Sequence, residues 1–158
     1  MEKIKISSLI HFQIKFFMSL QQHLKKLLII NDSKSTSFSS TIPLLESYKN
    51  IYWILGGLAK KGDKFKLNKK FISNIKAYVY GKDRNFLINS LPNQISCKSS
   101  STLMKIMKNL KNNIEKDNTK KVILFSPCAA SFDQFKNFED RGNYFKNYIK
   151  KNIYKLNV

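Results

Sequence analysis

Arginine is almost absent from this sequence of 158 residues. Only Arg84 and Arg141 are arginine, so 27 of the 29 basic residues are lysine, and the formal net charge is +19. A strongly basic chain suggests nucleic acid or an anionic membrane surface as a partner. Proteins that read phosphates and bases, however, rely on the planar fork of arginine. Scattered lysines among many Asn and Ile residues are typical of a codon bias, and we expect no specific nucleic-acid binding.

Cysteine and histidine are scarce as well, with two of each. Cys97 and Cys128 fit neither a disulfide framework nor a metal-ligand spacing, so we predict a reducing, cytoplasmic location and no metal site. His11 and His23 have no neighbouring acid and serine that would suggest a nucleophilic triad. The pattern Gly-x-x-x-x-Gly-Lys-Ser/Thr, which cradles nucleotide phosphates, occurs nowhere in the chain.

No long uninterrupted hydrophobic run is present. The apolar stretch from Leu9 to Leu20 contains Gln13 and Lys15 and is not followed by a small-residue cleavage site. We therefore predict neither a signal peptide nor a membrane span. Apolar residues make up 42% of the chain, which is enough for the core of one domain.

Short apolar runs alternate with longer amphipathic segments. We predict strands over 27–30, 51–55, 77–80, 94–97 and 121–125, and helices over 42–48, 67–75, 83–90, 101–116 and 137–151. Pro43 fits only the first turn of its helix, and Ser100 or Ser101 caps the fourth helix. Strands separated by helices predict a three-layer α/β/α, Rossmann-like domain with a mostly parallel sheet of five or six strands.

Polar or glycine-rich clusters follow three of these strands, over 31–37, 56–62 and 126–137. The carboxyl ends of parallel strands meet at one rim, where ligands bind. The first cluster places an acid, a lysine and hydroxyls at a helix N-terminus, which favours an anion, although a helix-capping loop explains it as well. In the second, a glycine pair allows close backbone approach and Lys60 can reach over it, although taken alone the pattern favours an ordinary loop. The third is too long and irregular for a simple connector.

The first and third clusters together resemble the C-terminal domain of the Mur ligase family, in particular the members that add D-glutamate. Residues 31–36 match that domain's Asn-Asp-Ser-Lys-Ala-Thr motif, with Ser35 in place of Ala. Residues 126–142 match its Ser-Pro-Ala-Cys-Ala-Ser, Asp-Gln-Phe-Lys-Asn-Phe and Glu-x-Arg-Gly motifs, with the positions of Cys and Ala exchanged. A strand that ends in Gly-Gly, with Lys60 just beyond, is also shared. The resemblance covers about residues 27–151.

The resemblance implies a part in ATP-dependent amide formation during peptidoglycan synthesis in the cytoplasm. In that reaction ATP phosphorylates the carboxylate of UDP-N-acetylmuramoyl-L-alanine, and the amine of D-glutamate attacks the acyl phosphate. ATP and Mg are bound mainly by domains that this chain does not match, and Asp32 is expected to face the nucleotide ribose. The other implied roles are charge neutralisation by the catalytic Lys34, binding of one D-glutamate carboxylate by Thr36 and Lys60, and binding of the other by Ser131 and the backbone N–H of Phe138.

The first part of the chain departs from the family. We assign residues 1–26 to a divergent segment and 27–158 to the domain, and Phe12 stands where the family has a nucleotide-contacting arginine. Without a phosphate-binding loop we expect no activity of the chain alone. A separate chain with the other domains would bring ATP and the UDP-linked substrate. Two alternatives stay open: a free-standing basic module that binds nucleic acid with this fold, and a pseudogene product.

Overall fold

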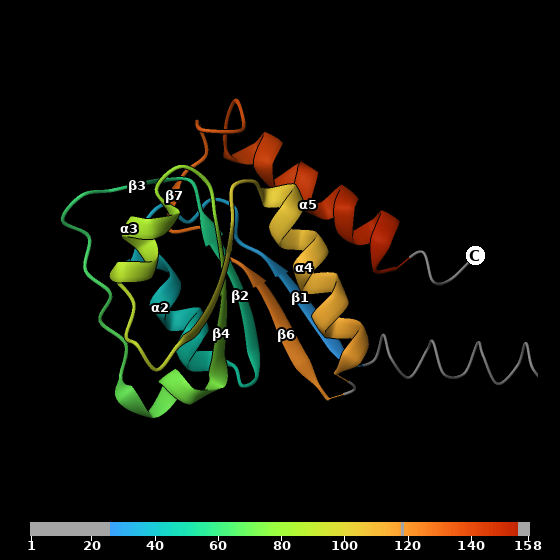
Figure 1. Ribbon diagram of the computed structural model, residues 1–158, viewed down its shortest axis with the longest axis horizontal. Coiled ribbons are helices and arrows are strands. Elements are labelled where there is room, and N and C mark those ends of the chain that lie inside the picture. Colours follow the sequence, from blue (N-terminus) through green and yellow to red (C-terminus); the bar gives the residue numbers. More distant parts are fainter. Residues whose placement is uncertain (1–25, 118, 155–158) are drawn as a thin grey trace, which may run out of the picture.

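The computed structural model describes residues 26–117 and 119–154. The predicted segment 1–26, with Phe12, therefore lies outside the described residues except for its last residue. The sheet has five parallel strands in the order β1-β6-β2-β4-β5 and is covered by helices on both faces (Figure 1). This arrangement confirms the predicted three-layer α/β/α fold with a mostly parallel sheet.

The strands of the sheet are β1 (Leu27–Asn31), β2 (Ile51–Gly56), β4 (Ile75–Tyr80), β5 (Ser96–Ser100) and β6 (Lys121–Phe125). The helices are α2 (Phe38–Ser47), α3 (Arg84–Asn89), α4 (Leu103–Lys116) and α5 (Phe138–Asn152), with a 3₁₀ helix, η1 (Lys69–Asn74). Two short strands, β3 (Leu58–Ala59) and β7 (Ala129–Ala130), form a separate antiparallel pair.

The core is divided between the two faces of the sheet, and β2 shows why. All six residues of this central strand are buried. Ile51, Trp53 and Leu55 pack with the buried residues of α2, η1 and α3. Tyr52 and Ile54 pack with those of α4 and α5 on the opposite face. A strand that is buried on both faces has no polar alternation, which is why β2 is a continuous apolar run in the sequence.

Helix α4 buries the face that its periodicity predicts, namely Leu103, Ile106, Met107, Leu110 and Ile114. The expected cap at Ser100 or Ser101 is wrong. Ser100 is still in β5, because it pairs with Tyr80 of β4. The cap is Thr102, whose hydroxyl accepts a hydrogen bond from the Lys105 N–H at 3.3 Å.

Other boundaries also differ from the prediction, and β4 starts at Ile75 rather than at residue 77. Helix α2 begins at Phe38, so Pro43 is in its sixth position rather than its first turn. Pro43 has no N–H group to donate to the carbonyl of Ser39, four residues earlier. Ser39 is exposed, so water can bond that carbonyl instead. The segment predicted as a helix over 67–75 is the short η1, which ends because Ile75 pairs with Ile51 in the sheet. β5 starts at Ser96 rather than at residue 94, because the Ile95 N–H closes a turn on the Pro92 carbonyl at 2.9 Å.

Candidate functional site

The three clusters lie together at the carboxyl edge of the sheet, as predicted. Asn31 pairs with Phe125 at the ends of β1 and β6, and the Asp32 N–H donates to the Phe125 carbonyl at 2.7 Å. The Gly56 N–H at the end of β2 donates to the Pro127 carbonyl at 3.0 Å. This last bond joins the second cluster to the third, and the Ser126 hydroxyl, 2.7 Å from Asp32 Oδ2, joins the first cluster to the third.

The pairing of β3 with β7 brings the second and third clusters into contact, and the sequence patterns did not predict it (Figure 1). Leu58 pairs with Ala130, and Ala59 pairs with Ala129. Lys60 follows β3 and Ser131 follows β7. Because the two strands run antiparallel, these two predicted site residues lie at opposite ends of the ladder. Lys60 is exposed, whereas Ser131 is only 4% exposed.

The first cluster alternates buried and exposed residues. Ser35 is buried, and its hydroxyl lies 2.7 Å from that of Ser40 and 2.8 Å from that of Thr41. Its neighbours Lys34 and Thr36 are exposed. Because the hydroxyl of Ser35 is held inside the protein, Lys34 and Thr36 lie on the solvent side of the rim, where a ligand can reach them.

A carboxylate of the protein itself already occupies part of the α2 N-terminus. The Phe38 N–H, in the first position of the helix, donates to Asp63 Oδ2 at 2.6 Å. The sequence patterns predict an anion at this terminus. The structure places Asp63 from the loop after β3 there, so this N–H group is already used within the protein.

Asp32 is held by a chain of buried hydroxyl groups. The Ser126 hydroxyl donates to Asp32 Oδ2 at 2.7 Å and lies 2.5 Å from the Thr41 hydroxyl. The Thr41 hydroxyl in turn lies 3.0 Å from the Cys128 sulfur. Burial raises the pKa of the Cys128 thiol to about 12, so at neutral pH it is a neutral member of this network rather than a nucleophile.

Phe138, the last predicted site residue, is the first residue of α5, and its side chain is 38% exposed. Its N–H belongs to the first turn, where no preceding helical carbonyl is available. Its own carbonyl accepts a hydrogen bond from the Ser33 hydroxyl at 2.8 Å, which joins the first cluster to α5. Glu139 and Asp140 add negative charge in the same turn, so a carboxylate bound there needs a further donor beside the helix.

Curated proteins of one kind are similar to this chain, although no family model matches it. The UDP-N-acetylmuramoylalanine–D-glutamate ligase of Agrobacterium fabrum is 40% identical over 117 residues, which are 73% of this chain and 25% of that ligase. The ligase of the same name from Brucella abortus is 35% identical over 148 residues, or 89% of this chain and 32% of the ligase. A Wolbachia ligase is 36% identical over 122 residues, or 77% and 24%. The chain belongs to the Mur ligase family. It spans between a quarter and a third of these relatives, consistent with a C-terminal domain.

Arg141 is a functional candidate in this Mur ligase domain to which the sequence analysis assigned no role. It is fully buried in α5, and its guanidinium donates three hydrogen bonds. Two go to the Ser33 hydroxyl and carbonyl, at 3.1 and 2.7 Å, and one goes to the Ala129 carbonyl at 2.9 Å. The side chain thereby clamps the first cluster to β7. The sequence did contain a signal for Arg141, because it is one of only two arginines among the 29 basic residues of the chain.

At the rim, the Ser126 hydroxyl orients the Asp32 carboxylate. The Asp32 carboxylate at the rim is a suitable acceptor for ribose hydroxyls. Among residues 26–117 and 119–154, no group of three or more His, Cys, Asp or Glu side chains is placed to hold a metal. None of the helices described is both long and apolar enough to span a membrane.

Proposed function

We propose that this chain is the D-glutamate-binding domain of a cytoplasmic ligase that joins D-glutamate to UDP-N-acetylmuramoyl-L-alanine in peptidoglycan synthesis. The domain covers residues 27–158 and follows a divergent segment, 1–26. ATP and Mg act in the complete enzyme through domains that this chain does not match, on the same or a separate chain. The observation that carries the proposal is the β3–β7 ladder, because it sets Lys60 and Ser131 on either side of one short span of the rim.

The spacing of these two residues suits a ligand with two carboxylates. Ala59 pairs with Ala129 and Leu58 with Ala130, so Lys60 and Ser131 are three residue steps apart along the ladder. At about 3.4 Å per step this is roughly 10 Å between the two positions. A lysine side chain and an amino acid with acid groups at both ends together fill such a gap.

Each carboxylate of D-glutamate is assigned its own donors. Lys60 supplies an ammonium group to one carboxylate, and the exposed Thr36 supplies a hydroxyl. Ser131 and the N–H of Phe138 bind the other, and the serine hydroxyl is the extra donor that this end of α5 needs beside Glu139 and Asp140. Hydrogen bonds to a charged group are about twice as strong as neutral ones, so few donors suffice for each carboxylate.

Lys34 and Asp32 are assigned to the reacting side of the site. The ammonium of Lys34 neutralises negative charge that gathers when the acid, the nucleotide and the amino acid meet. This effect is largest when water is excluded, because charges interact more strongly at low dielectric constant. Asp32 accepts from the nucleotide ribose with the oxygen that the Ser126 hydroxyl leaves available.

The experiment is an amide chemical-shift titration of the isolated chain with D-glutamate, read at Thr36, Lys60, Ser131 and Phe138. We expect weak, saturable binding, with L-glutamate weaker still, because both carboxylates stay wet and screened in an open site. Lys60→Ala and Ser131→Ala each remove a partner of a different carboxylate. A hydrogen bond to a charged group contributes about 1.5–3 kcal/mol, so each change should weaken binding about tenfold or more.

Lys69→Ala is the matched control, because it removes an exposed lysine of η1 that we assign to a solvated face. It should leave the D-glutamate shifts unchanged. Shifts that spread over the surface lysines, or that are equal for both enantiomers, would contradict the proposed site.

A further inference from the structure

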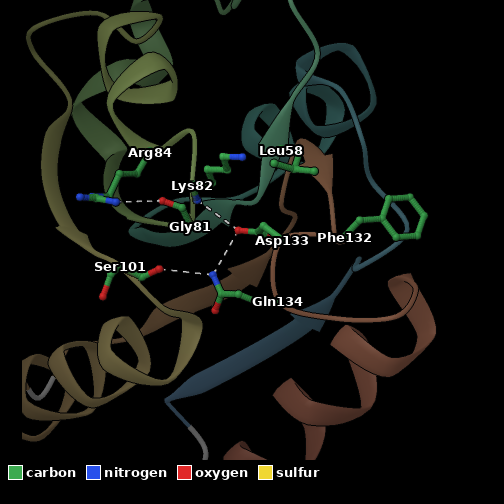
Figure 2. A pocket seen from close by; sticks show the side chains of 8 residues that line it. All are labelled: Leu58, Gly81, Lys82, Arg84, Ser101, Phe132, Asp133 and Gln134. Carbon is green, nitrogen blue, oxygen red and sulfur yellow. Dashed lines mark hydrogen bonds between the residues drawn. The ribbon is translucent and has the colours of Figure 1, made fainter.

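A cavity of about 420 Å³ opens at the same rim, and none of the residues proposed to bind D-glutamate lines it. We call it the rim cavity. It is lined by residues of the loops that follow β4 and β5, by Leu58 of β3, and by Phe132 to Gln134 after β7 (Figure 2). The loops after β4 and β5 do not belong to the three clusters noted in the sequence.

Hydrogen bonds fix the floor of the rim cavity. The Gln134 side chain accepts from the Leu103 N–H at 3.0 Å and donates to the Ser101 carbonyl at 3.3 Å. It also donates to Asp133 Oδ2 at 3.2 Å, and the Lys82 N–H donates to the same oxygen at 3.1 Å. The amide of Gln134 and the carboxylate of Asp133 are thus held in place at the floor of the cavity by bonds within the protein.

One oxygen of the carboxylate in this floor is hydrogen-bonded within the protein, and the other is buried without a partner in the described part of the chain. Oδ2 of Asp133 accepts the two hydrogen bonds above, whereas Oδ1 is buried and has no hydrogen-bond partner among the described residues. A Cβ atom at Gly81 would lie 2.6 Å from Oδ2, so glycine is required for this carboxylate to lie so deep. Oδ1 is out of contact with solvent, and among the described residues Asp133 forms no ion pair with the cations that line the cavity.

Those cations, Lys82 and Arg84, are unpaired. Neither forms an ion pair within 4.0 Å among the residues that the structure describes, where the ion pairs are Lys111 with Glu115 and Lys121 with Asp117. Arg84 uses one N–H for the Gly81 carbonyl at 3.2 Å, and the rest of its guanidinium is not hydrogen-bonded within that part of the chain. A planar guanidinium with free N–H groups fits a carboxylate or phosphate in two-point contact.

The opposite side of the rim cavity is apolar. Figure 2 shows Arg84 and Ser101 on one side, Asp133 and Gln134 in the middle, and Leu58 and Phe132 on the other side. Phe132 is 70% exposed, although large aromatic side chains are usually covered. A ligand that spans the cavity would therefore have an acidic end and an apolar end.

We propose that the rim cavity binds an organic acid whose carboxylate lies against Arg84 and Ser101 and whose apolar body lies against Leu58 and Phe132. The site goes beyond the proposed function, because it uses neither Thr36, Lys60, Ser131 nor Phe138. Phosphate is an anion like a carboxylate but has no apolar body. Comparing the two ligands therefore shows whether the cavity recognises the negative charge alone or the charge together with the apolar body.

The test is a chemical-shift titration of the intact chain with benzoate, acetate and inorganic phosphate. Benzoate should give saturable shifts at Leu58, Arg84 and Ser101, while acetate and phosphate bind several-fold more weakly because neither contacts Leu58 and Phe132. Arg84→Gln should weaken benzoate binding about tenfold, since it removes the charged hydrogen-bond donor. Lys108→Ala removes one exposed charge from α4 and should change nothing.

Two results would overturn the proposal. Benzoate shifts that do not saturate and that appear equally along the exposed lysines of α4 would mean adsorption to a basic surface. Phosphate that binds at Arg84 as tightly as benzoate would exclude an organic acid as the preferred ligand. D-Glutamate titrated into the Arg84→Gln variant should still shift Lys60 and Ser131, so failure of the rim cavity and failure of the proposed function are distinguishable.

Discussion

Asp117 and Lys121 show at the scale of single residues how this chain tolerates a buried ammonium group. Lys121 is 2% exposed, and its Nζ lies 3.2 Å from Asp117 Oδ2. The same oxygen accepts from the Tyr52 hydroxyl at 2.7 Å, and Oδ1 accepts from the Thr119 hydroxyl at 2.7 Å. These donors, Thr119 first and then Tyr52, hold the pKa of Asp117 well below its usual range. The cluster lies at the amino ends of the strands, away from the rim.

Asp117 should therefore make the stability of the fold depend on acid pH. Because its folded pKa lies below its unfolded pKa of about 3.9, its contribution is complete above pH 5 and is lost as the pH falls below that. Asp117→Asn should lower the free energy of unfolding at pH 7 by about 1–2 kcal/mol, since the site is partly solvated.

Thermal unfolding followed by circular dichroism from pH 7 to pH 2 measures this effect. The Tm curves of wild type and Asp117→Asn should approach each other as the pH falls below about 4, because the unfolded state then binds a proton at Asp117 that the folded state does not. Parallel curves over the whole range would show that Asp117 does not contribute through its ionised form. Glu46→Gln, in the exposed last turn of α2, is a control that removes a carboxylate with no hydrogen bond or ion pair among the described residues.

Strands β3 and β7 are the elements on which the site depends, although each has only two residues. Gly57, just before β3, has φ +130°, and a Cβ atom there would lie 2.2 Å from the Ala130 carbonyl oxygen. Any side chain at this position would push β3 away from β7. The distance between Lys60 and Ser131 is therefore controlled by the absence of a Cβ atom at Gly57.

Gly57→Ala should separate the two strands and destabilise the domain by about 2 kcal/mol or more, from the clash and the strained backbone together. D-Glutamate shifts at Lys60 and Ser131 should disappear with the ladder. Gly62→Ala is the matched control: its φ is also positive, at +87°, but a Cβ atom there meets nothing within 4 Å. It should cost about 1 kcal/mol of strain and leave binding intact. Equal loss of binding in both variants would contradict a role for the ladder.

Charge dominates the molecule as a whole, with a formal net charge of +19 carried almost entirely by lysine. If the chain is not a nucleic-acid module, any DNA binding should be weak, insensitive to sequence and lost steeply with salt. Fluorescence anisotropy with labelled duplex and single-stranded DNA at two salt concentrations measures this. Tight binding that persists at the higher salt would favour the nucleic-acid alternative.

Catalysis is the other property of the whole molecule that the chain alone should lack. Its 158 residues contain no phosphate-binding loop, and phosphoryl transfer depends on a cradle for the phosphates and their metal. We expect the purified chain neither to hydrolyse ATP nor to form the D-glutamyl amide. A coupled phosphate-release assay tests this, with Lys34→Ala as the background. Release by wild type above that background would disprove the prediction.

The sequence by itself determined the fold class, the strand β2, the buried face of α4 and membership of the Mur ligase family. These properties are encoded in contiguous residues. Burial on both faces gives a continuous apolar run, burial of one helix face gives a period of 3.6 residues, and a family motif is a short ordered string. The same locality placed the three clusters at one rim, because each follows a parallel strand directly.

The tertiary structure alone decided how the clusters meet. Arg141 reaches Ser33, 108 positions away, and Asp63 occupies the α2 N-terminus from 25 residues downstream. The β3–β7 ladder, the unpaired Arg84 and the rim cavity likewise arise from segments distant in the chain. No local periodicity or propensity encodes such contacts, because they depend on the packing of whole layers, which brings side chains together only once the sheet and its helices have formed.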